Sequence, residues 1–184
     1  FNSFADPRKE TYTWNRAMPD ALGAFSSGQL AMYVGYASDL EKILAKNPHL
    51  NFDVAEVPQI KDGAVKATYA YSFGLAVSKQ SRSIPASLTF IYDLTSFNQQ
   101  KLLAETALTP PTLRTLLANP PANPALEIFY ASAVKARAWL DPDPARTGPI
   151  FQEMSSSVLS GSKRLDTAVG SAQNQINALF PKTQ

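Results

Sequence analysis

The stretch AMYVGYASDLEKI, residues 31–43, changes its pattern at its midpoint. Residues 31–34 are apolar and rich in strand-forming side chains, whereas residues 39–43 follow the spacing of a helix. Ser38 and Glu41 match the capping box, in which the serine hydroxyl accepts from the backbone N–H three residues later and the glutamate reaches back. Gly35 would give the backbone its freedom to turn. The stretch therefore predicts a strand that turns sharply into a helix.

The rest of the chain predicts few strands and many helices. Residues 67–77, ATYAYSFGLAV, carry bulky side chains at odd positions and small ones at even positions, which is typical of a strand. We expect an irregular arm over residues 1–16, a turn over residues 58–65, strands over residues 29–34, 51–57 and 67–77, and helices over residues 19–27, 39–46, 85–97, 98–106, 111–118, 124–138, 144–159 and 163–179. This order favours a mixed α/β or α+β fold.

Composition excludes several classes of protein. The chain has 184 residues, enough for one or two domains, and its 45% hydrophobic content is typical of a globular protein. Lys and Arg number 17 against 15 Asp and Glu, and these charges are scattered, so we expect no nucleic-acid partner. The absence of cysteine removes disulfides, thiolate metal sites and thiol nucleophiles.

Residues suited to catalysis are scarce. The single histidine, His49, lies in a predicted turn, where an exposed or capping role is more common than a catalytic one. Asp141 and Asp143 could act as paired carboxylates, but each precedes a proline and a rigid turn before the next helix is the preferred interpretation. Zinc motifs, phosphate-binding loops and dinucleotide fingerprints are absent from the sequence, so we expect no metal and no cofactor.

Aromatic side chains support a binding role better. Tyr and Trp combine an apolar face with a polar tip, which suits sugars, whose rings have apolar C–H faces and hydroxyl rims. We interpret Tyr33 and Phe73 as core residues, while Tyr36, Tyr71 and Trp139 could equally line a ligand site or fill the interior. Free N–H groups at the start of the helix after residue 38 could donate to a ligand.

Four segments resemble one family in order and spacing. They are FSSGQLAMYVGYASDLEKI, NPHLNFDVAEVPQ, YAYSFGLAVSKQS and LSGSKRLDTAVGSAQNQINALF. Together they are similar to the C-terminal half of bacterial extracellular solute-binding proteins of ABC importers, in particular the sugar-binding group that includes maltose-binding protein. The resemblance extends from about residue 14 to residue 180. The closing segment resembles the family's last helix, with Ala168, Ala172 and Ile176 as its inner stripe.

The resemblance implies a partial periplasmic-binding-protein fold of type II, in which two α/β lobes close on a ligand like a Venus flytrap. Residues 17–58 and 123–184 would belong to the C-terminal lobe, and residues 59–122 to the N-terminal lobe with the hinge crossings. The implied cleft residues, carried over by position, are Tyr36, Ser38, Tyr69, Tyr71, Ser72 and Trp139. In the returning strand, relatives often have a glycine pair or a tryptophan where this chain has Tyr71, Ser72 and Phe73.

The implied function is solute binding for transport. We expect a non-catalytic, extracellular or periplasmic protein that binds a sugar or oligosaccharide, delivers it to an ABC permease, and is tethered to the membrane as a lipoprotein in full-length form. Because each lobe would lack part of its sheet, we also expect a homodimer or an intertwined assembly. The alternatives are a non-catalytic structural or interaction domain, and a hydrolase that uses Asp141, Asp143 or Glu153.

Overall fold

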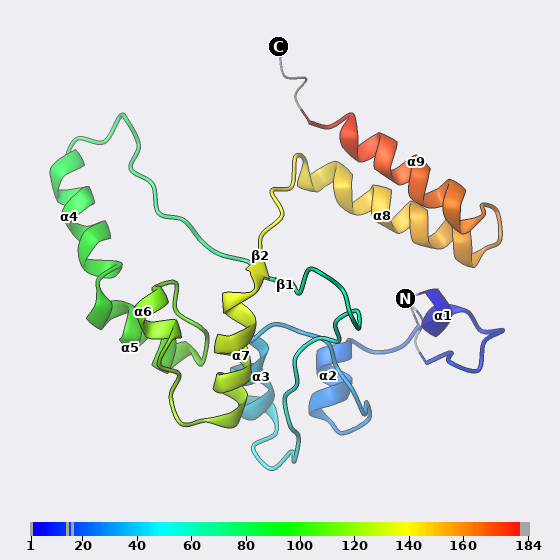
Figure 1. The fold of residues 1–184 in the computed structure, drawn as a ribbon, viewed down its shortest axis with the longest axis horizontal. Coiled ribbons are helices and arrows are strands. Elements are labelled where there is room, and N and C mark those ends of the chain that lie inside the picture. The colour runs from blue at the N-terminus through cyan, green and yellow to red at the C-terminus, as the bar shows by residue number, and fades with distance from the viewer. Residues whose placement is uncertain (1, 14, 16, 181–184) are drawn as a thin grey trace. The chain divides into compact units, whose positions relative to one another are not determined.

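The computed structural model describes residues 2–13, 15 and 17–180. They fall into two compact units, which we describe separately. The terminal unit, Phe1–Pro19 with Trp139–Gln184, contains α1 (Asn2–Ala5), α8 (Pro144–Leu159) and α9 (Leu165–Asn177). The central unit, Asp20–Ala138, contains α2 (Ala21–Ser26), α3 (Asp39–Lys46), β1 (Thr68–Tyr69), α4 (Ile84–Leu94), α5 (Phe97–Ala107), α6 (Arg114–Leu117), α7 (Pro124–Val134) and β2 (Ala136–Arg137) (Figure 1).

The fold is mostly helical, with a small parallel sheet. In the part of the chain that the structure describes, β1 and β2 pair with each other, with Thr68 opposite Ala136 and Tyr69 opposite Arg137. The hydroxyl of Thr68 also donates to the carbonyl of Ser132, at 2.7 Å, in the last turn of α7. None of the helices within the described residues is long and apolar enough to span a membrane.

The core of the central unit forms where α3 meets α7. Leu40, Leu126 and Tyr130 are buried together, and partly buried apolar residues pack around them: Phe52, Leu108, Leu117, Ala125 and Phe129. The start of α7 is fixed by Asn123, whose side-chain oxygen accepts from the backbone N–H groups of Ala125 and Leu126 at 3.1 and 3.2 Å. This packing holds the N-terminal half of α3 in place.

The terminal unit is built on a hairpin of α8 and α9 (Figure 1). Ala168 and Ala172 on α9 are buried, and their small side chains let the two helices approach closely. Gly161 lies between the helices with φ of +77°, a left-handed conformation that glycine adopts without strain. The predicted stripe on the last helix is confirmed at Ala168 and Ala172, while Ile176 is half-buried.

Two predicted strands do not form, and a third is much shorter than predicted. Residues 29–34 and 51–57 lie outside the strands, and only Thr68 and Tyr69 of residues 67–77 join a ladder. The period-two pattern itself is real in residues 51–57, because Phe52, Val54 and Glu56 are half-buried and their neighbours are exposed. A strand also requires a partner for its backbone hydrogen bonds, and a local pattern carries no information about that partner.

The helices match the prediction more closely, with exceptions at their ends. In addition, α1 forms at residues 2–5, inside the arm over residues 1–16 that was expected to be irregular. Residues 144–159 form α8 as predicted, whereas the helix predicted over residues 111–118 is reduced to α6. The helix predicted over residues 124–138 ends at Val134, because the chain then enters β2. Gly28 follows α2 with φ of +77°, which confirms the predicted left-handed position after that helix.

Candidate ligand-binding site

The joint before α3 is a tight turn that leaves Tyr36 at the surface. The carbonyl of Tyr36 accepts from the backbone N–H of Asp39 at 2.9 Å, and that of Ala37 accepts from Leu40 at 3.0 Å. The predicted capping box is wrong in its main contact, because the Ser38 side chain makes no capping hydrogen bond and Ser38 already has helical φ and ψ. The residue that organises the turn is Asp39.

Asp39 is buried, and three groups contact its carboxylate. One oxygen accepts from the Tyr33 hydroxyl at 2.9 Å and from the backbone N–H of Tyr36 at 3.1 Å. The other oxygen accepts from Lys42 Nζ at 2.9 Å, which forms an ion pair one turn along α3. These contacts fix both the turn and the backbone of Tyr36. Asp39 was not among the site residues predicted from the sequence. The pattern that could have indicated its role is an aspartate at the first helical position with a lysine three residues later.

The electrostatics of this cluster favour an ionised Asp39 and a neutral Tyr33. Burial by itself raises the pKa of Asp39, but hydrogen bonds from Lys42, the Tyr36 backbone and Tyr33 outweigh it, so the pKa lies below the usual aspartate value. Burial, followed by the hydrogen bond to Asp39, raises the pKa of Tyr33 to about 12. At neutral pH the Tyr33 hydroxyl therefore stays protonated, and it donates a hydrogen bond to the ionised carboxylate of Asp39.

Gly35 is required for space. A Cβ at this position would overlap the Tyr33 ring and would lie 2.8 Å from Oδ2 of Asp39. Its backbone is not in the left-handed region, in contrast to Gly28 and Gly161. The sequence predicts that Gly35 is needed for backbone freedom. In the structure it is needed because the Tyr33 side chain lies too close to leave room for a Cβ.

Tyr36 and Tyr69 form an exposed aromatic pair. Their ring centroids are 6.2 Å apart with an interplanar angle of 57°, and the two side chains come from the α3 joint and from β1. Tyr36 is 55% exposed and Tyr69 is 51% exposed, so solvent reaches both rings. The structure thus brings together two of the predicted site residues, which are separated in sequence but share one aromatic surface.

Of the other predicted site residues, Ser38 is exposed in the same joint as Tyr36, and the rest lie elsewhere on the chain. Tyr71 is exposed and its ring meets that of Phe73 edge-on at 5.2 Å, and Ser72 between them is exposed. Phe73 was interpreted as a core residue, which is wrong, because it is 86% exposed on a segment that has no covering strand among the described residues. Trp139 belongs to the terminal unit, where its ring contacts Phe151 at 6.0 Å.

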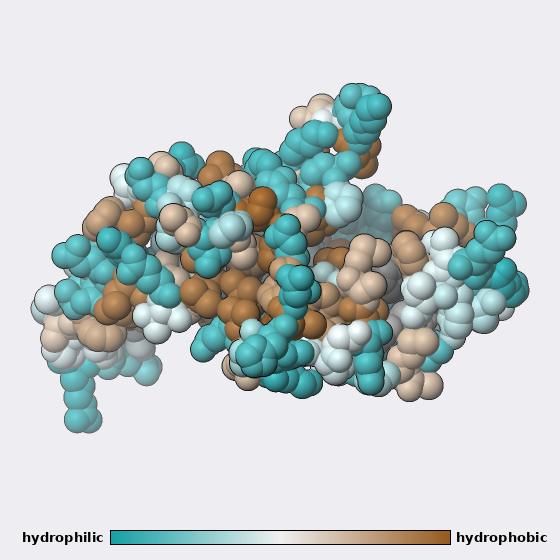
Figure 2. Space-filling view, turned by 90° about the horizontal axis from the view of Figure 1, so that it is seen from below, coloured by the Kyte–Doolittle hydropathy of each residue, from teal (hydrophilic) through white to brown (hydrophobic). Residues whose placement is uncertain are grey.

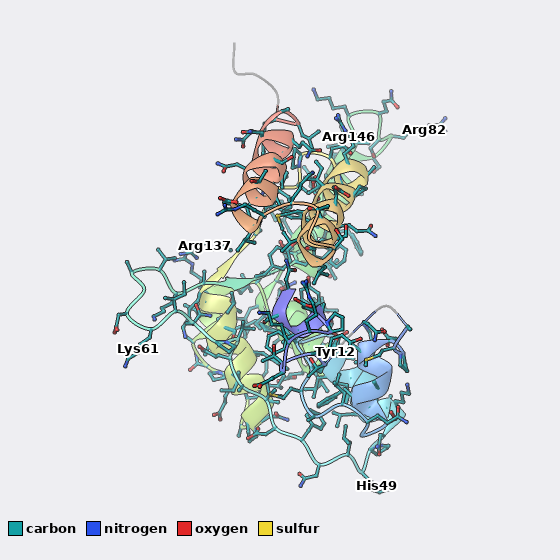
Figure 3. All side chains as sticks on the ribbon, turned by 90° about the vertical axis from the view of Figure 1, so that its right-hand side faces the viewer. Tyr12, His49, Lys61, Arg82, Arg137 and Arg146 are labelled. Carbon is teal, nitrogen blue, oxygen red and sulfur yellow. The ribbon has the colours of Figure 1, made fainter. Side chains whose placement is uncertain are left out.

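The candidate catalytic residues lie in turns and on α8. His49 is exposed in the turn after α3, as predicted (Figure 3). Asp141 accepts hydrogen bonds from the backbone N–H of Asp143 at 3.0 Å and from the Thr147 hydroxyl at 2.7 Å, which confirms a rigid turn before α8. Glu153 forms an exposed ion pair with Lys163. Within the described residues no group of three acidic or histidine side chains is placed to hold a metal ion.

A shallow apolar groove beside α4 was not predicted. It has a volume of about 580 Å³ and lies between residues 75–78 and α4, with Leu75, Val77, Phe90 and Ile91 on its walls. None of the described residues of α4 is buried, although the helix is strongly apolar. The sequence signal was the run of apolar residues over 84–94, which lacks the polar face of an ordinary surface helix.

The chain was compared with known proteins. The family described as bacterial extracellular solute-binding protein matches residues 1–128, which include the Asp39 cluster and the Tyr36–Tyr69 pair. A comparison with curated proteins finds no match. Because the family match covers more than half of the chain, this protein belongs to the bacterial extracellular solute-binding proteins.

Proposed function

We propose that the protein is the solute-binding component of an ABC importer and that its ligand is a sugar or an oligosaccharide. Family membership supports an extracellular solute-binding role in transport. The observation that carries the choice of ligand is the exposed Tyr36–Tyr69 pair, with centroids 6.2 Å apart. Two tilted aromatic faces present apolar surface to the C–H faces of a sugar ring, and their hydroxyls can bond its rim.

The rigid support of Tyr36 strengthens this proposal. The Tyr36 backbone donates to Asp39, and Asp39 is held in turn by Tyr33 and Lys42. A ring whose backbone is already fixed loses less conformational entropy when a ligand binds, and this favours affinity. The backbone that carries Tyr69 is also held in place, here by the pairing of β1 with β2.

The proposed site consists of the aromatic pair and polar or aromatic groups near it in sequence. We propose Tyr36, Ser38, Tyr69, Tyr71 and Ser72 as its residues, all of them in the central unit. The proposed architecture is a type II Venus-flytrap fold, with residues 17–58 and 123–184 in one lobe and residues 59–122 in the other. The family membership supports it.

The proposed partners and location follow from the proposed transport role. The ligand-loaded protein would deliver its sugar to an ABC permease. It would act outside the cytoplasmic membrane, tethered as a lipoprotein in the full-length form, and a second copy of the chain would cover exposed apolar surface of the central unit. The family description, with its extracellular location, supports the first two proposals.

Calorimetric titration with a panel of mono- and oligosaccharides tests the proposed function. Tyr36→Ala and Tyr69→Ala should each weaken binding of the best sugar about fivefold, because an aromatic contact contributes about 1 kcal/mol. His49→Ala is the control, because His49 is exposed in the turn after α3. Unchanged affinity in both tyrosine variants would rule out this surface as the sugar site.

A further inference from the structure

An arginine lies next to the aromatic pair. Arg137 is the β2 residue in register with Tyr69 of β1. Neighbouring strands are about 4.8 Å apart and residues in register extend to the same face of a sheet, so the Arg137 side chain starts beside Tyr69. Arg137 is exposed, and Figure 3 labels it where β2 ends. Tyr36, Tyr69 and Arg137 thus belong to one surface of the central unit.

The guanidinium of Arg137 has most of its hydrogen-bonding capacity free. It has five N–H donors. Its protein contact among the described residues is a 3.0 Å hydrogen bond from Nη1 to the carbonyl of Ala136. Within that same part of the chain, no carboxylate lies within ion-pair distance of it.

Two other cations near the surface, Lys135 and Lys42, already have carboxylate partners. Lys135, two residues earlier, forms an ion pair with Glu56 at 2.8 Å. Asp39, behind Tyr36, is buried and paired with Lys42. Arg137, in contrast, has no carboxylate partner within the described residues. A ligand that covers the two rings would meet that charge.

We propose that the ligand of the Tyr36–Tyr69 surface is a sugar that carries a carboxylate, which Arg137 binds. The proposal rests on the proposed function and narrows it from sugars to acidic sugars. A guanidinium forms two parallel hydrogen bonds with a carboxylate, a geometry that an ammonium group cannot reproduce. The tyrosine rings would hold the apolar face of the sugar, and Arg137 would select the acid over the neutral sugar.

Calorimetric titration of the full 184-residue chain with a matched set of ligands tests this selection. The probes are glucuronate, its neutral methyl ester and glucose. The unmodified protein should bind glucuronate about tenfold or more tightly than either neutral probe, since a charge-assisted hydrogen bond is strong. Arg137→Gln should abolish that preference by lowering the affinity for glucuronate to that of the neutral probes. Arg82→Gln, a change at an exposed arginine before α4, is the control and should keep the preference.

The outcomes separate this inference from the proposed function. Equal affinity for glucuronate and glucose, or a preference that survives Arg137→Gln, would overturn the inference and leave sugar binding intact. A preference that Arg82→Gln removes equally would also overturn it, because that result indicates general charge attraction. If no sugar binds, the proposed function fails and the inference fails with it. If a sugar binds but Tyr36→Ala and Tyr69→Ala change nothing, the proposed site fails, and the inference fails while sugar binding stands.

Discussion

At the scale of single residues, Asp39 determines the geometry of the candidate site. Its carboxylate joins Tyr33, the Tyr36 backbone and Lys42, so one buried charge fixes the position from which the Tyr36 ring projects. The sequence predicted that residues 36 and 69 serve one site, through a family resemblance. It did not predict Asp39, because an aspartate in the first turn of a helix is explained by helix polarity alone. The contacts of Asp39 with Tyr33 and with the Tyr36 backbone depend on how the joint folds, which the sequence pattern does not specify.

Asp39→Asn should destabilise the protein by about 1 to 3 kcal/mol, because a charged hydrogen-bond acceptor is lost in a buried position. The folded pKa of Asp39 is lowered, so its contribution is present above the ordinary aspartate value of about 3.9 and is lost as the pH falls through the lower folded pKa. Urea denaturation between pH 7 and pH 2 should show the two proteins converging in acid. A constant difference over that range would contradict the role of the charge. Asp53→Asn, at an exposed position, is the control.

At the scale of elements, helices were predicted better than strands. The limits of α8 follow from local signals, because a proline suits its first turn and Gly161 marks the turn after it. Residues 29–34 also carry the apolar pattern of a strand, yet they form none, because pairing depends on which segments meet in space. The prediction of Phe73 as a core residue was wrong for a related reason. Alternating bulky and small side chains indicate which residues share a face, but they do not indicate whether another element covers that face.

The joint between residues 29–34 and α3 gives a test at this scale. Gly35→Ala should displace the Tyr33 ring from Asp39 and cost about 1 to 3 kcal/mol, the usual penalty for overpacking. Gly170→Ala, in α9, is the matched control: a Cβ there meets no atom within 4 Å and no proline follows, so this change should be neutral or slightly stabilising. Thermal unfolding of the two variants compares them directly. Equal stability of both would show that Tyr33 has room to move aside.

At the scale of the whole molecule, the amount of exposed apolar surface is the main feature. Apolar side chains cover large areas of the face shown in Figure 2. In the central unit, Tyr71, Phe73, Phe90 and Tyr92 are each more than 60% exposed. Large aromatic side chains have roughly 150 to 250 Å² of surface, so these four expose roughly 600 Å² per copy. Leu75, Ile84 and Leu88 add to this area.

That area supports the proposed association with a second copy of the chain. A standard interface takes about 800 Å² from each partner. The surface formed by residues 73–77 and α4 carries a single charged residue, Asp93, so two copies can meet with little charge to desolvate. Light scattering should give a dimer mass at micromolar concentration, and Phe73→Ser with Phe90→Ser should give a monomer. His49→Ser, at an exposed turn, should remain dimeric. A monomer at every concentration would contradict the proposal.

The hydrogen bond from the Thr68 hydroxyl to the carbonyl of Ser132 links the strand that carries Tyr69 to the end of α7. Any molecule that immobilises Tyr69 therefore also restrains fraying at the C-terminal turn of that helix. Occupancy of the site would then be detectable as slower amide exchange some distance from the ligand, in residues that never touch it.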